Sequence, residues 1–430
     1  MLGIELFNGS TGHNCFAGRP PDIWADWTNR EGPFGRWFGG VHLAYRVAEI
    51  SVRVIVTGIF ITWKRKIQVM SKYSVGIVGT GPDPDSPSVD GFAMGYRHAE
   101  AYRNHDNCEV IACADVVRSN AEAFAAEFDL EPDALFEEYT AMVEEMRPDI
   151  VSVTVPPPIH EEIVVGIAKT GLVDAIHCEK PMADTFAGAK RMVAACEGGD
   201  VQLTFNRQRR FSRTYTEAKR LLDDGAIGDL TRVEISWGDF FDTGAHTVDL
   251  SGMFNDERPA EWVIGQLDYR DSDVRFGLHQ ENQMWAQWRY DDGVYGVVST
   301  GEGESMIDGE FLLRGTEGMI QINVGEQPAL VLTSDGGRQP MDVAEKSDSG
   351  KSSGNHFGSV LHNRAIAAVV EALESGTESQ LSGQIGLKTA EILFGSYESV
   401  RRRGRVDFPL DINDSPLESM VESGDLTPSD

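Results

Sequence analysis

Two short motifs in this 430-residue chain combine residue types that redox chemistry needs. Gly79-Thr80-Gly81 follows an apolar run at residues 75–78, and Glu179-Lys180-Pro181 follows another at residues 173–178. A glycine turn after a buried strand lets the backbone approach a pyrophosphate, and a turn that ends a second strand brings a lysine to the same sheet edge. Taken alone, the first motif is an ordinary tight turn and the second a surface tripeptide. Their order and their separation by about one α/β domain favour a nucleotide-dependent redox site.

The glycine that should pack the first helix closely against the turn stands at Gly95, some distance beyond Gly81. We therefore interpret residues 82–92 as a loop inserted between the turn and the helix. Three aspartates in this loop would repel a pyrophosphate. The loop is expected to point outward or to cover the cofactor from a distance.

The next apolar run, at residues 109–114, ends in Asp115. A carboxylate at this position accepts hydrogen bonds from the adenosine ribose hydroxyls of NAD. It would repel the 2′-phosphate of NADP, an effect that Arg118 would partly offset. NAD is therefore the expected cofactor, with NADP as the alternative, and the structural alternative for Asp115 is a helix N-cap.

A further apolar run at residues 150–155 is followed by Pro156, two more prolines and His160, which lead into a helix near Glu161. This turn is expected to flank the nicotinamide. Pro156 and His160 are thus candidate cofactor contacts, as are Glu179 and Lys180 at the end of the next strand, although a histidine at a helix start also serves as a structural cap.

Short apolar runs alternate with helical stretches from Tyr73 onward, which predicts βαβ units and a parallel sheet. Residues 231–237 alternate strictly between apolar and polar, and five more short strands are predicted between residues 284 and 333. A polar, Gly- and Ser-rich stretch at residues 334–354 is predicted to be a loop, and a helical sequence pattern resumes at Phe357. The fold class is therefore α/β, with a nucleotide-binding domain at residues 70–200, a mainly antiparallel domain at 201–410 and an acidic tail at 411–430.

The formal net charge of −30 excludes nucleic acid and anionic membranes as favourable partners. Such an acid excess fits a protein from a salt-loving organism, and an ordinary acidic cytosolic protein is the alternative. The five cysteines show no spacing typical of a zinc site or a disulfide framework. They are expected to be buried reduced thiols, which indicates the cytoplasm, and no metal is expected.

Residues 1–69 differ from the rest of the chain because they hold five acidic and eight basic side chains and four of the eight tryptophans. We interpret this segment as an atypical extension and hypothesise that translation begins at Met70; native peptides upstream of Met70, detected by mass spectrometry, would contradict this. The apolar run at residues 54–63 is shorter than the ~20 residues of a spanning helix. A membrane anchor is therefore disfavoured.

The combination of Gly79-x-Gly81, Asp115, Cys178-Glu179-Lys180-Pro181 and Asp242-Thr243-Gly244-Ala245-His246 resembles the Gfo/Idh/MocA oxidoreductases, the group of glucose-fructose oxidoreductase and inositol dehydrogenase. The resemblance covers about residues 73–410. It implies an N-terminal Rossmann domain, a C-terminal domain with an open and mostly antiparallel sheet, and a homodimer or homotetramer formed through that sheet.

The resemblance also assigns roles at the site. It implies that Lys180 contacts the substrate hydroxyl and the cofactor ribose, that His246 transfers the proton and that Asp242 belongs to the same polar group. It implies a cis peptide bond before Pro181. Residues four apart share a helix face, so Asp242 and His246 are expected to face one cleft if this stretch is helical, while Gly244 favours a helix start there.

The expected function is an NAD(P)-dependent dehydrogenase that acts on a hydroxyl carbon of a sugar, inositol or related polyol. A dinucleotide-binding sensor without turnover is the alternative, and hydride exchange on a cofactor that never leaves is a third. The cationic stretch at residues 206–210 either binds substrate or forms salt bridges. Aromatic residues at positions 237, 240, 241 and 285 either line the pocket or belong to the core.

Overall fold

The computed structural model describes residues 72–82, 93–323, 328–341, 343 and 359–428, together with the backbone of three upstream strands. Those strands, β1 (Ile4–Phe7), β2 (Arg46–Val56) and β3 (Ile59–Val69), form an antiparallel sheet in a unit of their own. The rest of the chain from Tyr73 onward, apart from residues 374–376, forms the second compact unit. The expected start at Met70 and most of the inserted loop lie outside the described residues.

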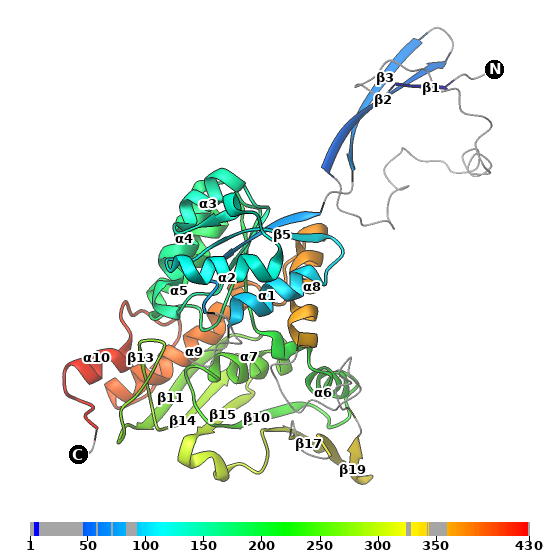
Figure 1. Ribbon diagram of the computed structural model, residues 1–430. Helices are drawn as coiled ribbons and strands as arrows, with labels where there is room; N and C mark the ends of the chain where they lie inside the picture. The colour runs from blue at the N-terminus through cyan, green and yellow to red at the C-terminus, as the bar shows by residue number, and fades with distance from the viewer. Residues whose placement is uncertain are drawn as a thin grey trace. The chain divides into compact units, whose positions relative to one another are not determined.

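The first half of the main unit is a six-stranded parallel sheet with the order β6-β5-β4-β7-β8-β9, covered by helices on both faces (Figure 1). Its strands are short and apolar because both faces are buried, as expected for parallel sheets. The strand order reverses beside β4, which is where open α/β sheets form their ligand crevice. The strands are β4 (Tyr73–Val78), β5 (Cys108–Ala114), β6 (Leu135–Phe136), β7 (Ile150–Val153), β8 (Ala175–Cys178) and β9 (Gln202–Phe205). The helices are α1 (Met94–Arg103), α2 (Arg118–Phe128), α3 (Tyr139–Met146), α4 (His160–Thr170) and α5 (Phe186–Gly198).

The second half contains a nine-stranded sheet in the order β19-β18-β17-β16-β10-β15-β14-β11-β20. All neighbouring strands are antiparallel except β10 and β15, which run parallel. The strands are β10 (Leu230–Trp237), β11 (Ala260–Asp268), β14 (Gln283–Tyr290), β15 (Tyr295–Thr300), β16 (Phe311–Gly315), β17 (Gly318–Ile322), β18 (Leu330–Ser334), β19 (Gly337–Met341) and β20 (Val406–Asp407), with a separate hairpin of β12 (Asp273–Arg275) and β13 (Leu278–Gln280). The expected α/β fold with a large, mostly antiparallel sheet is confirmed.

One face of this sheet is covered by helices α6 (Arg213–Asp223), α7 (Gly244–Phe254) and α9 (Gly383–Arg402) (Figure 1). The alternation along β14 explains this, because Met284, Ala286 and Trp288 are buried while the residues between them are half-buried. Helix α9 packs on β11 and also on α5 and β9, so it joins the two domains. A continuous apolar core runs through both.

Several local expectations need correction. The stretch at residues 334–354 was expected to be a loop, but Gly337–Met341 forms β19, which pairs with β18. Strand β9 lies beyond residue 200 and completes the parallel sheet, so this sheet extends past the expected domain boundary. Within residues 411–428, Pro416–Glu422 forms α10, whose Leu417 and Met420 are buried. Helix α8 (Ser359–Ser375) begins close to the expected position.

Two further findings concern composition. Cys108, Cys113, Cys178 and Cys196 are buried and no disulfide joins them, as expected, while Cys15 lies outside the described residues. Among the described helices, none combines the length and the apolar character required to cross a bilayer.

Candidate active site at the sheet edge

The glycine turn after β4 has the backbone that a dinucleotide-binding turn requires. Gly79 and Gly81 adopt φ values of +83° and +69°, a region that favours glycine. A Cβ atom on Gly95 would lie 2.9 Å from both the Cα and the carbonyl oxygen of Thr80 and 3.0 Å from the carbonyl oxygen of Gly79. Helix α1 therefore packs directly on the turn, as expected for Gly95 from the sequence.

Asp115 holds this turn from the end of β5. Its Oδ2 accepts hydrogen bonds from Thr80 Oγ1 and from the Gly81 amide, both at 3.0 Å. Its Oδ1 accepts from the Val117 amide at 2.9 Å and from Asn120 Nδ2 at 3.3 Å, which orders the start of α2. The carboxylate thus lies beside the turn and bonds the segment that leads into α2, but Val117 is the N-cap of that helix, so the N-cap interpretation of Asp115 is wrong.

The turn after β7 is fixed by His160, which is fully buried. Its Nδ1 lies 2.9 Å from the Pro181 carbonyl oxygen and its Nε2 lies 2.8 Å from the Val155 carbonyl oxygen. Burial lowers the pKa of His160, so the ring is neutral near pH 7 and donates only one of these two bonds. His160 therefore ties the Lys-Pro turn to the preceding strand, while Pro156 is exposed at the same edge.

Glu179 belongs to a buried polar network that sequence reasoning missed. Its Oε1 accepts from Asn206 Nδ2 at 2.6 Å and lies 2.8 Å from His98 Nε2, and its Oε2 accepts from the Lys180 amide at 3.1 Å. Ser152 Oγ lies 2.7 Å from the other ring nitrogen of His98. Burial alone would raise the pKa of Glu179, but the hydrogen bond and charge of His98 outweigh it and the pKa falls to about 2. The ionised carboxylate thus fixes the backbone that carries Lys180.

Lys180 reaches across from the first domain to Asp242 in the second. The Lys180-Pro181 peptide is cis, as the resemblance implies. Lys180 Nζ forms an ion pair with Asp242 Oδ1 and lies 3.4 Å from the Asp242 carbonyl oxygen. The two side chains are 17% and 14% exposed, so this ion pair is largely shielded from water. The structure therefore brings together two residues that lie 62 positions apart in the sequence.

His246 lies in the first turn of α7, which begins at Gly244 as expected from the sequence. Its amide donates to the Thr243 carbonyl oxygen at 2.8 Å, and its side chain is almost completely buried. Asp242 precedes this helix by two residues. The loop between β10 and α7 thus carries Asp242, and the first turn of α7 carries His246.

The cationic stretch after β9 forms salt bridges inside the protein. Arg210 pairs with Asp249 through Nε and Nη2, at 2.5 and 2.7 Å, and with Glu257 at 2.5 Å. Arg207 also pairs with Asp249. The Asp249 carboxylate is thus shared by two guanidinium groups. Buried pairs of this kind anchor α7, and with it the His246 turn, to the domain junction.

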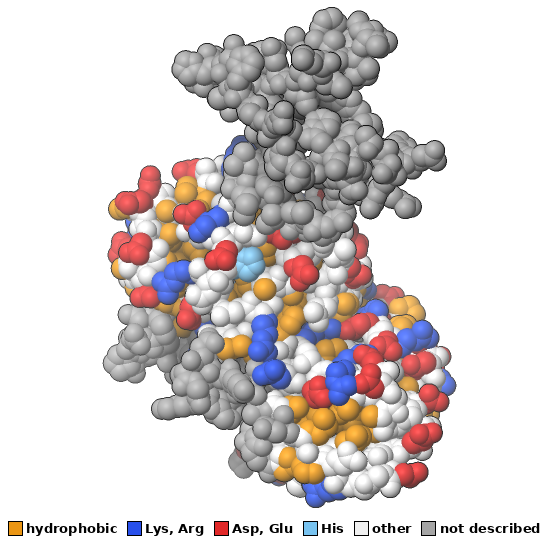
Figure 2. Space-filling model, turned by 90° about the vertical axis from the view of Figure 1, so that its right-hand side faces the viewer, with side chains coloured by type: hydrophobic (Ala, Val, Ile, Leu, Met, Phe, Trp, Pro, Cys, Tyr) orange, Lys and Arg blue, Asp and Glu red, His pale blue; other side chains and the backbone are white. Residues whose placement is uncertain are grey.

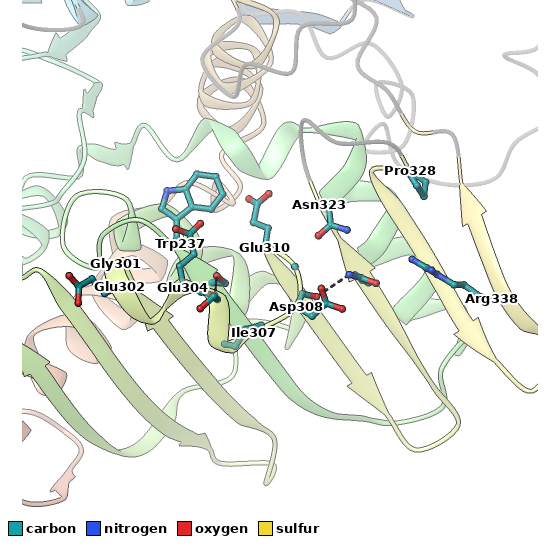
Figure 3. Close-up of a pocket in the computed structure, with 14 residues that line it drawn as sticks. Trp237, Gly301, Glu302, Glu304, Ile307, Asp308, Glu310, Asn323, Pro328 and Arg338 are labelled. Carbon is teal, nitrogen blue, oxygen red and sulfur yellow. Dashed lines mark hydrogen bonds between the residues drawn. The ribbon is translucent and has the colours of Figure 1, made fainter.

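One hollow is lined in part by Lys180, and a second lies at the end of β10. A small one of about 20 Å³ is lined by Lys180, Pro181, Phe241 and residues of α9, and it is too small for a sugar. A wider recess of about 800 Å³ begins at Trp237, five residues before Asp242 (Figure 3). Figure 3 shows the side chains of Trp237 and Glu310 on the same side of the strands that line it. The carboxylates that line it belong to Glu302, Glu304, Asp308 and Glu310.

Residues 74–207 match the profile of a family described as an oxidoreductase family with an NAD-binding Rossmann fold. This segment contains the glycine turn, Asp115 and the Lys-Pro turn. Residues 74–207 form a Gfo/Idh/MocA domain. The match extends over the first domain of this oxidoreductase and makes that domain an NAD-binding domain.

Similarity to known proteins extends beyond the first domain. The chain is 25% identical over 362 residues to D-apiose dehydrogenase of Paraburkholderia graminis, an alignment that covers 76% of this chain and 90% of that one. It is 22% identical over 279 residues to myo-inositol 2-dehydrogenase of Thermotoga maritima, which covers 61% and 79%. The structure of levoglucosan dehydrogenase with NADH and L-sorbose superposes with a TM-score of 0.66 at 18% identity and covers 80% of this chain and all of that one, which shows a shared fold.

The first domain fits NAD on the observed geometry. Among the described residues, no atom lies within 4 Å of a Cβ built on Gly81, while Gly95 keeps α1 close behind the turn. Thr80 and the Gly81 amide meet the Asp115 carboxylate there. An open glycine turn with an adjacent carboxylate is the arrangement that receives a pyrophosphate and a ribose.

Proposed function

We propose that the protein is an NAD-dependent dehydrogenase that oxidises a secondary hydroxyl of a sugar, an inositol or a related polyol. The observation that carries this proposal is the Lys180–Asp242 ion pair, because it unites the strand-ending turn of the NAD-binding domain with the loop that precedes His246. The names of the relatives support the substrate class. A sensor without turnover is disfavoured, since it has no need of a lysine, an aspartate and a histidine at this edge.

The proposed roles follow from where these groups lie. When bound, NAD accepts the hydrogen of the alcohol carbon together with its electron pair. Lys180, fixed by Glu179 from behind, orients the substrate hydroxyl and shields the charge that develops on its oxygen. His246 accepts the hydroxyl proton, for which an imidazole is well suited near neutrality. Asp242 holds the ammonium group of Lys180 in place.

The cofactor-binding residues are Gly79, Thr80, Gly81, Gly95 and Asp115, with Pro156 and His160 on the nicotinamide side. NAD is favoured over NADP because Asp115 already presents an acceptor beside the turn. Arg118, which was expected to offset that charge, forms a hydrogen bond with Glu122 at 3.1 Å. Glu179 supports Lys180 from the buried side.

We assign the recess that begins at Trp237 to the substrate. Carboxylates and an indole face are groups that recognise polyols, because the carboxylates accept hydrogen bonds from hydroxyls and the indole packs against C–H faces. The guanidinium group of Arg209 lies over the ring of Trp237 at 4.7 Å and fixes the indole from the protein side. The recess is lined by four carboxylates and one guanidinium group, that of Arg338, and this excess of negative charge disfavours a phosphorylated sugar.

We further propose that the helix-free face of the nine-stranded sheet pairs with a second copy of the chain in the cytoplasm. Trp262, Ile264, Tyr295 and Val297 share that face by their strand register, and Ile264 is 38% exposed. In Figure 2, hydrophobic side chains gather on the lower part of the molecule, among positively and negatively charged side chains. Light scattering should report a dimer or tetramer, and Ile264→Glu should convert it to a monomer; a monomeric native protein would contradict this.

The experiment that tests the function monitors NADH fluorescence with the full-length protein, NAD or NADP, and a panel of sugars and inositols at low and high salt. Reduction of NAD by one class of polyol, lost in Lys180→Ala and kept in the matched control Lys388→Ala, supports the proposal. Lys388 is a suitable control because its ammonium group donates to the Glu257 carbonyl oxygen, away from Asp242. Tight NADH binding without turnover of any polyol would contradict it and favour the sensor.

A further inference from the structure

A buried carboxyl group outside the assigned site holds the loop that carries Asp242. Glu281 lies between β13 and β14 and is 4% exposed. Its Oε1 accepts a hydrogen bond from the Phe240 amide at 2.7 Å, and its Oε2 accepts one from the Tyr397 hydroxyl. Phe240 precedes Asp242 by two residues, and Tyr397 projects from α9. Glu281 thus connects the loop to the helix that joins the two domains.

A second carboxylate fixes the other side of the same loop. Asp239 accepts from both the amide and the hydroxyl group of Thr243, each at 2.6 Å. Asp242 therefore lies between two points at which the backbone is hydrogen-bonded to a buried carboxyl group. With the amides of Phe240 and Thr243 held, the backbone between them has little freedom to turn the Asp242 side chain away from Lys180.

The surroundings of Glu281 make its charged form costly to bury, so this residue is not buried because it stabilises the fold. Burial and the charge of Asp239 raise the pKa of Glu281, the hydrogen bonds from Tyr397 and the Phe240 amide lower it, and the net result is a pKa of about 7. The other charged groups nearby are Arg275, which contacts Asp239 at 3.4 Å, and Glu418 of α10, which lies near Tyr397 and accepts from the His279 amide at 2.7 Å. A carboxyl group that is costly to bury, with both oxygens committed to one loop and its support, is better explained by positioning than by packing.

We propose that Glu281 is a positioning residue for the reaction, which acts by holding the Phe240 backbone so that Asp242 meets Lys180. This inference rests on the proposed function of Lys180 and Asp242. Glu281 touches neither residue and acts through the loop alone. Tyr397 donates a hydrogen bond to Glu281 and so helps to hold the same loop.

The structural consequence is testable without a substrate. Hydrogen exchange of the peptide that contains residues 238–243 should accelerate at least tenfold in Glu281→Ala, because the Phe240 amide loses its acceptor. Glu281→Gln should exchange like the native protein, since its amide oxygen can still accept that bond. Glu398→Gln is the matched control: Glu398 is as buried as Glu281 and follows Tyr397 on α9, but it pairs with Arg401 and Arg402. Unchanged exchange in Glu281→Ala would overturn the proposal.

The kinetic consequence separates positioning from a general loss of structure. In Glu281→Ala, kcat should fall 10- to 100-fold while KM and the Kd for NADH stay within about twofold, and Glu281→Gln should restore most of the rate. In an Asp242→Asn background the same Glu281→Ala change should have almost no further effect, because its only target is already gone. Multiplicative losses in the double variant would overturn the inference. Full activity of Asp242→Asn alone would instead contradict the proposed function, which keeps the two failures distinct.

Discussion

Replacement of Gly95 by alanine tests whether the close contact between α1 and the glycine turn is what shapes the cofactor site. The added Cβ would lie 2.9 Å from two backbone atoms of Thr80 and 3.0 Å from the carbonyl oxygen of Gly79. These are backbone atoms, so relief of the clash must displace the turn itself. We expect Gly95→Ala to weaken NADH binding at least tenfold, which corresponds to about 1.4 kcal/mol.

Gly95→Ala should affect the free energy of unfolding less than NADH binding, because two opposing effects on stability partly cancel. Alanine gains up to about 1 kcal/mol over glycine in a helix, whereas overpacking costs about 1–3 kcal/mol. Gly95→Ala should therefore lose about 0–2 kcal/mol in urea unfolding. Gly198→Ala is the matched control, because Gly198 ends α5 and a Cβ there meets no atom within 4 Å. It should be neutral or stabilising and should bind NADH normally.

Fluorescence titration with NADH and urea unfolding of both variants provide the test. The reasoning is refuted if Gly95→Ala binds NADH as tightly as the native protein, or if both alanine variants weaken binding equally. In the first case the turn tolerates displacement, and in the second the loss comes from helix substitution in general.

Three further predictions concern buried charges. Folding raises the pKa of the Glu281 carboxyl group from 4.5 to about 7, which gives the native protein a stabilisation of roughly 3 kcal/mol below pH 4.5 that it loses as the pH rises through 7. Glu281→Gln removes this pH dependence, so in urea unfolding the variant should become increasingly more stable than the native protein from pH 5 to 8. A difference in unfolding free energy that does not change with pH would contradict this. Asp249→Ala should destabilise the protein by about 3–5 kcal/mol because it leaves Arg207 and Arg210 buried without their shared carboxylate, and calorimetry with a change in Tm below 2 °C would refute it. Asp115→Ser should lower the NAD to NADP ratio of kcat/KM at least tenfold, and an unchanged ratio would show that Asp115 only orders α2.

The sequence predicts those parts of the fold that depend on local pattern. Apolar runs followed by glycine, aspartate or proline locate β4, β5, β7 and β8 within a few residues, since buried parallel strands are short and uniformly apolar. Strict alternation locates β10. The pattern fails at β19, Gly-Arg-Gln-Pro-Met, because an edge strand with exposed side chains carries no apolar period.

The candidate site is predictable in its reactive residues but less so in their supports. Lys180, Asp242 and His246 stand in short sequence motifs, which can be recognised without the structure. The contacts of Glu179 with His98 and of Glu281 with Phe240 join residues 81 and 41 positions apart, and neither pair has any local pattern. The same holds for Asp249, whose arginine partners come from the stretch after β9. Such contacts arise only when segments that are distant in the sequence pack together.

The most direct test of the central claim is a double-mutant cycle of kcat/KM between Lys180 and Asp242 with the preferred polyol and NAD. We predict that Lys180→Ala and Asp242→Asn each lower kcat/KM by about 10²- to 10⁴-fold while NADH still binds, and that the double variant is no slower than the slower single variant, because the two residues act as one unit across the domain boundary. Independent, multiplicative losses, or a single variant with native kcat/KM, would contradict the account.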